Sequence, residues 1–103
     1  MKILVTGSSG FLGSHIADAL SNAGHTVLLL DLETSKWLRS DQNMICTNIL
    51  DRKKVQEAVR GIDVIYHLAA LADINEAISK PRDTIETNII GTLNLLEAAA
   101  NEG

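Results

Sequence analysis

The sequence predicts an α/β fold: a doubly wound parallel sheet in which strands and helices alternate as βαβαβαβα, with strand order 3-2-1-4. Three observations predict it. Apolar runs typical of buried parallel strands alternate with segments of helical periodicity. A glycine-rich turn joins the first run to the first helical segment. No linker or low-complexity stretch interrupts the alternation, and 103 residues suffice for one domain, so we expect a single domain over residues 1–103.

The first unit is a strand, a glycine turn and the start of a helix. The run Ile3-Leu4-Val5 precedes the segment 6–13, which reads TGSSGFLG. Gly7 can adopt the positive φ of a sharp turn, Gly10 lets the backbone approach a pyrophosphate, and Gly13 lets the helix lie close to the strand. Free N–H groups at the helix N-terminus would then hold the anion. The helical pattern recurs at Leu12, Ile16, Ala19, Leu20 and Ala23.

The second strand ends on an acidic residue. Residues 26–30 are apolar or β-branched, and Asp31 follows them directly. A carboxylate at the carboxyl end of the second strand can accept hydrogen bonds from an adenosine ribose and repel a 2′-phosphate. The alternative is that Asp31 only caps the next segment and that the glycines form an ordinary turn. Because the motif, its order and its spacing agree, we favour a dinucleotide site.

The rest of the chain supplies two more strands and two more helices. We expect a third strand at 43–47 and, after the cap residue Asp51, a helix that Gly61 ends. The helix should run through Val55, Ala58 and Val59. Residues 63–68 form a nearly continuous apolar run, which suits a fourth strand covered on both faces.

The last helix begins near a proline. Pro81 is suited to a first helical turn. Apolar residues recur along one face at Ile85, Ile89, Leu93, Leu96 and Ala100. With strand order 3-2-1-4 the ligand crevice should lie between the carboxyl ends of strands one and four, where segments 7–12 and 68–70 face each other.

Composition narrows the possible partners and setting. The formal net charge is −4 and the basic residues are scattered, which argues against a nucleic-acid surface. Cys46 is the single cysteine, so we expect no internal disulfide, a buried core thiol and a cytoplasmic setting. No apolar run approaches the roughly 18 residues of a membrane span, and we expect neither a span nor a signal peptide. The three histidines lack metal-ligand spacing, so we assign no metal.

Four segments together resemble the NAD-dependent epimerase/dehydratase family of extended short-chain dehydrogenases/reductases. They are the glycine turn 6–13, the strand-end Asp31, the segment 67–70 (HLAA) and the segment 88–99, which reads NIIGTLNLLEAA. The resemblance covers essentially the whole chain but only the N-terminal part of such an enzyme. It implies a truncated Rossmann-type fold that binds NAD, in a parent that acts on a nucleotide sugar.

The resemblance also implies which residues contact the cofactor. The residues carried over to the NAD site are Gly7, Ser9, Gly10, Phe11, Leu12, Gly13, Asp31, Asn48, Ile49, Leu68, Ala69, Ala70 and Asn88. One of them departs from the family pattern, because the adenine-contacting pair begins with Asp in the family and with Asn48 here. An amide can still donate and accept, but it lacks the charge-assisted contact. His67 is expected to be a hydrogen-bonded structural residue rather than a catalytic one.

The catalytic residues of the family are missing. Family members use a tyrosinate with a lysine four positions on, whereas the only tyrosine here, Tyr66, is followed four positions on by Ala70. We therefore assign no catalytic residue and expect no activity from the chain alone. Either it is the NAD-binding part of an epimerase or dehydratase, or it is a complete non-catalytic dinucleotide-binding or partner-binding module. If the chain is such a part, an unpaired edge at the fourth strand should promote self-association, whereas a monomer would favour the complete module.

Overall fold

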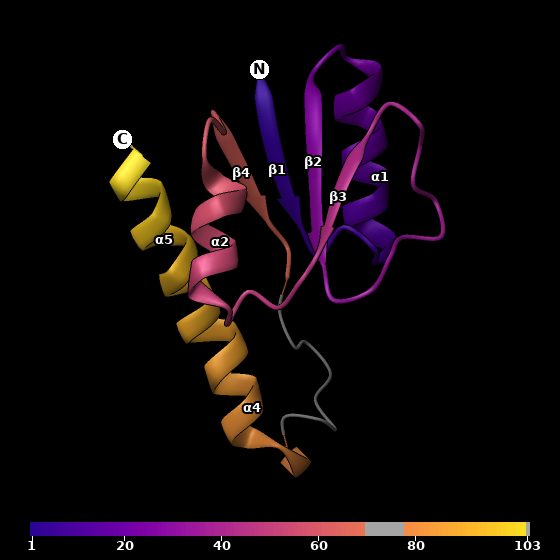
Figure 1. Cartoon of the computed structure of the whole chain (residues 1–103). Coiled ribbons are helices and arrows are strands. Elements are labelled where there is room, and N and C mark those ends of the chain that lie inside the picture. Colours follow the sequence, from indigo (N-terminus) through magenta and orange to yellow (C-terminus); the bar gives the residue numbers. More distant parts are fainter. Residues whose placement is uncertain (70–77, 103) are drawn as a thin grey trace.

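We describe the protein from a computed structural model, in which residues 1–69 and 78–102 are described (Figure 1). The strands are β1 (Lys2–Thr6), β2 (Thr26–Asp31), β3 (Asn43–Cys46) and β4 (Val64–His67). The helices are α1 (Phe11–Asn22), α2 (Arg52–Val59), α4 (Pro81–Ile85), the π-helical segment η1 (Glu86–Ile90) and α5 (Gly91–Glu102). No helix in the described ranges is long and apolar enough to cross a membrane.

The four strands form one parallel sheet in the order β3-β2-β1-β4. In its register Ile3 lies between Val27 of β2 and Val64 of β4. This confirms the predicted 3-2-1-4 topology and the reversal at β1. A reversal of this kind opens a crevice at the carboxyl ends of the central strands.

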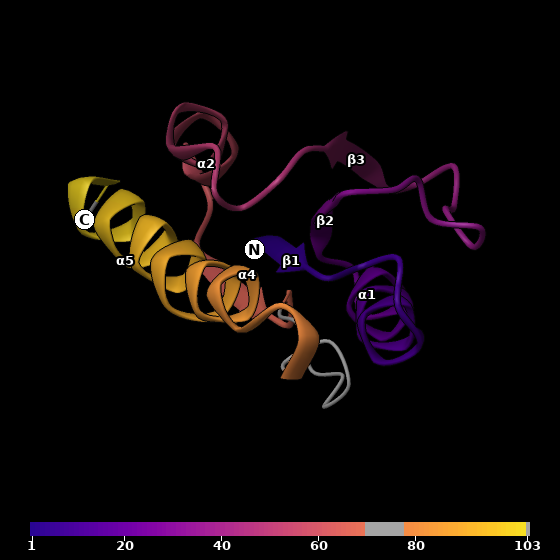
Figure 2. The same cartoon turned by 90° about the horizontal axis from the view of Figure 1, so that it is seen from below.

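Two helical layers cover the two faces of the sheet (Figure 2). On one face, Leu4 and Leu30 pack with Val55 of α2 and Leu95 of α5. On the other, Val5 and Leu29 pack with Ala17 of α1. The core residues of β1 and β2 are nearly all inaccessible to solvent, as expected for parallel strands covered on both faces.

Helix α2 begins and ends as its sequence predicts. The side chain of Asp51 accepts a hydrogen bond from the backbone N–H of Lys54 at 3.2 Å, which caps the helix N-terminus. Val55, Ala58 and Val59 are buried. Gly61 follows the helix end with a φ of 72°.

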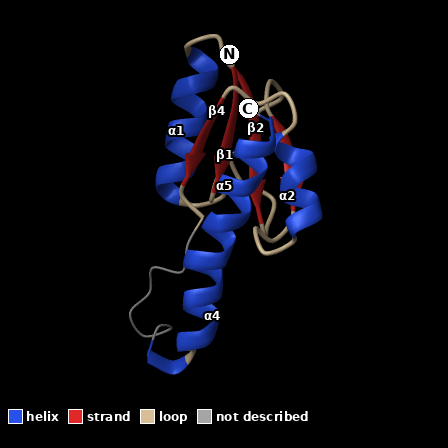
Figure 3. Cartoon of the chain, turned by 90° about the vertical axis from the view of Figure 1, so that its left-hand side faces the viewer, coloured by secondary structure: helices blue, strands red, loops and turns tan. Residues whose placement is uncertain are grey.

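The apolar stripe predicted on the last helix is exposed. Ile85, Ile89, Leu93 and Leu96 are all exposed, and the residues buried in α5 are Gly91, Asn94, Leu95 and Ala98. Two of these four buried residues, Gly91 and Ala98, have small side chains, which lets the helix pack closely. Figures 1 and 3 show that α4 extends beyond the carboxyl ends of the strands.

Two burial expectations are wrong for the same reason. In the described residues β4 and β3 are the two edges of the sheet. No residue of β4 is fully buried, and Tyr66 is exposed, so the strand is not covered on both faces. The thiol of Cys46, at the end of β3, is also exposed instead of lying in the core. Edge position, which local hydropathy does not report, decides both.

Candidate functional site: a pocket at the glycine turn

The turn between β1 and α1 is held by close backbone contacts. Gly7 has a φ of 69°, so its glycine is required, as predicted. A Cβ on Gly7 would lie 2.7 Å from the carbonyl carbon of Leu68. The turn therefore touches the segment that follows β4, as the predicted crevice requires.

The other two glycines of the turn differ in what surrounds them. A Cβ on Gly13 would lie 2.2 Å from the carbonyl oxygen of Gly7, so α1 packs directly on the turn. A Cβ on Gly10 would meet only the same oxygen, at 3.4 Å. Nothing in the described structure therefore excludes a side chain at position 10. A ligand that approaches the backbone there would explain the glycine.

The N-terminus of α1 is open to an anion. Gly10 is the N-cap, no side chain caps the helix, and its first turn carries no acidic residue. The first N–H groups of a helix have no partner within the helix, and the helix dipole adds a partial positive charge there. A phosphate or pyrophosphate fits these donors.

A cavity of about 270 Å³ lies at this turn. Seven of the predicted residues line it: Gly7, Gly10, Asp31, Asn48, Ile49, Leu68 and Ala69. They come from the turn and from the ends of β2, β3 and β4. The structure thus brings the predicted pyrophosphate, ribose and adenine contacts to one place.

Asp31 is held in position at the end of β2. One carboxylate oxygen accepts a hydrogen bond from the backbone N–H of Ser9 at 2.9 Å, and the other accepts from Leu32 at 2.6 Å. Each carboxylate oxygen has a second lone pair for a ligand hydroxyl. Asp31 does cap a local segment, as the alternative reading supposed, but it also lines the cavity.

The adenine-side pair is used partly for local structure. The side-chain oxygen of Asn48 accepts from the backbone N–H of Leu50 at 2.9 Å. Ile49 is buried and packs against Gly91, where a Cβ would lie 2.3 Å from its Cδ1. The carbonyl oxygen of Ile49 accepts from the buried side chain of Asn94 at 2.9 Å. The last helix therefore fixes this wall of the cavity.

Several predicted residues do not line the cavity. Phe11 and Leu12 are exposed at the start of α1, and the ring of Phe11 packs edge-to-face on His15. Ser9 contributes its N–H to Asp31 and its hydroxyl to the carbonyl of Glu33. Ser8 is fully buried, and its hydroxyl is the one buried side-chain oxygen or nitrogen without a partner in the described residues.

Three further predicted residues are not among those that line the cavity. Gly13 lies beneath the turn, and Asn88 lies on η1, while its neighbour Thr87 lines the cavity. Ala70 lies outside the described residues. The lining residues that the sequence reasoning missed are Leu30, Leu32, Thr47 and Thr87. Thr47 could have been found, since it directly follows the third strand.

His67 bridges β1 and the last helix. Its Nδ1 lies 2.7 Å from Thr6 Oγ1 and its Nε2 lies 2.9 Å from Thr92 Oγ1. Partial burial lowers its pKa from the ordinary value of 6.5, so the ring is mainly neutral at pH 7. The prediction of a hydrogen-bonded structural histidine agrees with these contacts.

A second, larger cavity of about 690 Å³ lies beside the edge of β4, under α5. Its walls include Ile65, His67, Leu95, Leu96 and Ala99. The glycine turn and Asp31 are not among its lining residues. The uncapped helix N-terminus and the strand-end carboxylate meet at the smaller cavity.

Comparisons with known proteins agree with this geometry. The sequence pattern of the NAD dependent epimerase/dehydratase family matches residues 3–103. The chain is 38% identical over 104 residues to a UDP-N-acetyl-alpha-D-glucosaminuronate decarboxylase of Bacillus cytotoxicus. This match covers 95% of this chain and 32% of that protein.

Solved structures give the same result. A UDP-glucose 4-epimerase of Thermotoga maritima, solved with UDP-glucose, superposes with a TM-score of 0.94 at 33% identity, covering 100% of this chain and 35% of that one. A UDP-glucose 4-epimerase of Thermus thermophilus in complex with NAD gives 0.93 at 32% identity, with the same coverage. The chain thus spans about a third of the length of these relatives.

Proposed function

The chain belongs to the NAD dependent epimerase/dehydratase family, and we propose that its 103 residues form a dinucleotide-binding domain that holds NAD at the glycine turn. The observation that carries the proposal is the cavity that joins the uncapped N-terminus of α1 to Asp31. Among the described residues, no group of three or more His, Cys, Asp or Glu side chains could hold a metal ion.

Each wall of the cavity has a part in this proposal. The first N–H groups of α1 bind the pyrophosphate, and the missing Cβ of Gly10 leaves room for it. Asp31 binds the hydroxyls of the adenosine ribose. Asn48 and Ile49 flank the adenine, and Leu68 and Ala69 follow the cofactor toward its nicotinamide end. Bound NAD supplies a hydride acceptor that can return the hydride to its substrate.

Ser9, Phe11, Leu12, Ala70 and Asn88 stay predictions as cofactor contacts. Ser9 supports the site through Asp31, and Phe11 and Leu12 contribute through the backbone of the first helical turn. A cytoplasmic location also stays a prediction, consistent with the free, exposed thiol of Cys46.

We further propose that the chain serves a longer enzyme that acts on a nucleotide sugar. The support is that the decarboxylase of Bacillus cytotoxicus and the epimerase of Thermotoga maritima described above are nucleotide-sugar enzymes about three times its length. Tyr66 lies on β4 and has no lysine four positions on, so the chain's own residues offer no tyrosine and lysine pair for proton transfer. The reading frame beyond codon 103 discriminates this proposal from a complete binding module, because a Tyr-x-x-x-Lys pair encoded there favours the enzyme.

Titration with NAD tests the binding proposal. We expect the purified chain to bind NAD and the variant Gly10→Ala to bind at least about tenfold more weakly, because its methyl group occupies the path of the pyrophosphate. Circular dichroism should show that Gly10→Ala melts close to the wild type, since only one atom lies within reach of the new Cβ. Wild-type chain that binds no NAD at millimolar concentration would refute the proposal.

Self-association through β4 is a separate proposal. In the described residues β4 pairs only with β1, and the larger cavity exposes apolar side chains beside its other edge. An unpaired strand edge is a template for another strand. We expect light scattering to show a rise in average mass with concentration, and Tyr66→Lys to abolish the rise by placing a charge on the exposed edge.

Leu93→Lys is the matched control for that experiment. Leu93 is similarly exposed but lies on α5 instead of on the edge strand β4. If Leu93→Lys restored the monomer and Tyr66→Lys did not, association would occur through the helix face. A wild-type monomer at high concentration would rule out both surfaces.

A further inference from the structure

Thr92 belongs to the segment 88–99 that carries the family resemblance, yet it does not line the cofactor cavity. Its hydroxyl lies 2.7 Å from the carbonyl oxygen of Asn88 and donates to it. A hydroxyl has one hydrogen, so Thr92 Oγ1 must accept in its contact with His67. The contact with Nε2, at 2.9 Å, therefore requires a hydrogen on that nitrogen.

The hydrogen on Nε2 of His67 determines which atom donates and which accepts in the other hydrogen bonds of this series. A neutral imidazole with Nε2–H has an acceptor at Nδ1, so Thr6 Oγ1 must donate to it across the 2.7 Å contact. The two lone pairs of Thr6 Oγ1 accept the backbone N–H groups of Leu68 at 3.0 Å and Ala69 at 3.1 Å. The N–H of Leu68 also lies 3.2 Å from the backbone oxygen of Thr6, so this hydrogen is shared between two acceptors.

The series ends on the wall of the cofactor cavity. Leu68 and Ala69 line that cavity and lie against Gly7, whose missing Cβ would meet their backbone. The alternative tautomer, with Nδ1–H, would place two hydrogens between His67 and Thr6 or remove one of the two backbone bonds. Only one hydrogen arrangement satisfies all the contacts.

We propose that Thr92 and His67 are positioning residues that hold the Leu68–Ala69 backbone at the cofactor turn, with His67 as the neutral Nε2–H tautomer. The proposal rests on the proposed NAD site for its functional consequence. Its structural content does not, because the direction of the hydrogen bonds can be measured without cofactor.

Nitrogen-15 NMR of the histidine rings is the first measurement. At neutral pH the wild-type chain should show His67 with a protonated Nε2 and an unprotonated Nδ1. In Thr92→Val, which keeps the shape and removes the acceptor, we expect a tautomer mixture and shifted amide resonances for Leu68 and Ala69. Thr92→Ser retains the hydroxyl and should restore both signals.

NAD affinity is the second measurement. Leaving the ring N–H without an acceptor should weaken binding by about tenfold in Thr92→Val, whereas Thr92→Ser should stay within about twofold of the wild type. An Nδ1–H ring in the wild type, or Thr92→Val with unchanged amides and affinity, would overturn the proposal. If the wild type bound no NAD, the binding proposal would fail, and the tautomer and amide shifts would still decide the positioning role.

Discussion

Replacing Gly13 with alanine is expected to remove NAD binding and to lower the free energy of unfolding by about 3 kcal/mol, near the upper end of the usual cost of overpacking. The new Cβ would lie 2.2 Å from the carbonyl oxygen of Gly7 and 3.0 Å from the Cα of Ser8. Both atoms belong to the backbone of the turn, so no side-chain rotation relieves the clash. Helix α1 must move away from β1, and the turn that presents its N-terminus moves with it.

The loss is large for a domain of this size. Small domains are stable by about 5–15 kcal/mol in total, and 3 kcal/mol lowers the melting temperature of a 100-residue domain by more than roughly 10 °C. Thermal melting followed by circular dichroism measures the loss, and NAD titration below the melting temperature measures binding. Gly10→Ala is the matched control, because it should lose binding without the loss of stability. A Gly13→Ala variant that melts like the wild type would show that α1 does not need this close approach.

The positions of the central strands and of the glycine turn could be predicted from the sequence because both depend on local chemistry. The runs at 3–5 and 26–30 are apolar without alternation, which identifies strands covered on both faces. The requirement for glycine at position 7 follows from its positive φ. Asp31 follows β2 directly, so its place at the carboxyl edge of the sheet follows from the strand itself.

The orientation of the two flanking helices could not be predicted from apolar periodicity. In α1 the buried residues are Gly13, Ser14 and Ala17, and Leu12 is exposed. In α5 two of the four buried residues, Gly91 and Ala98, are small. Close packing on a sheet selects small side chains, and the larger apolar residues then lie at the sides of the helix. A search for large apolar residues therefore identifies the helix but assigns the wrong face as the buried one.

Contacts between segments far apart in the sequence could not be predicted from local sequence patterns either. Thr87 reaches the cofactor cavity from η1, where π-helical winding changes the direction of successive side chains. Asn94 reaches the carbonyl of Ile49 only because α5 packs beside the loop after β3. No spacing rule relates such pairs, since the sheet and its helices bring them together.

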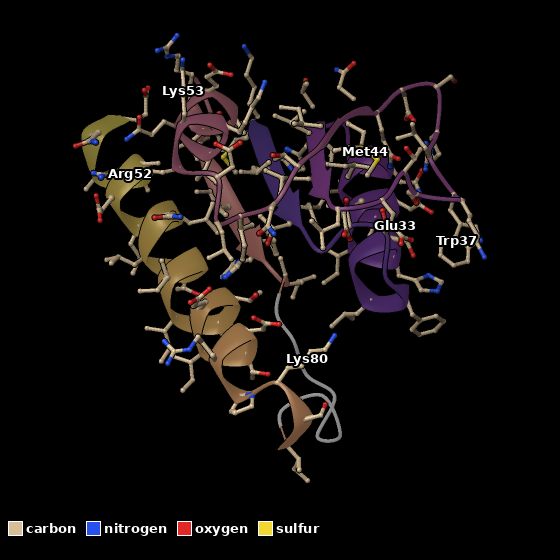
Figure 4. All side chains as sticks on the ribbon, turned by 60° about the horizontal axis from the view of Figure 1, so that its bottom comes forward. Glu33, Trp37, Met44, Arg52, Lys53 and Lys80 are labelled. Atoms are coloured by element: carbon tan, nitrogen blue, oxygen red, sulfur yellow. The ribbon has the colours of Figure 1, made fainter. Side chains whose placement is uncertain are left out.

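Asp31 should make the chain select NAD over NADP by at least about 100-fold. Placing a carboxylate against a 2′-phosphate in a desolvated site costs several kcal/mol, and 100-fold corresponds to about 2.7 kcal/mol. Arg39, the first arginine after Asp31 in the sequence, is already engaged. Arg39 is paired with Asp41 at 2.8 Å and donates to Asn22 at the end of α1. Figure 4 shows Glu33 on the loop after β2, with Arg52 and Lys53 on the opposite side of the molecule.

Asp31→Asn separates the charge of this residue from its shape. The amide keeps an oxygen that can accept from Ser9, loses the acceptor for the N–H of Leu32, and no longer repels a phosphate. We expect calorimetric titration to show weaker NAD binding, tighter NADP binding and a preference reduced to less than about tenfold. Glu33→Ala is the control for general negative charge, because only the backbone oxygen of Glu33 contacts the turn; it should leave most of the preference intact. Asp31 is the one charged side chain that lines the cavity in the described structure. Equal affinity of the wild type for the two cofactors, or an unchanged affinity ratio in Asp31→Asn, would therefore show that this carboxylate does not discriminate between them.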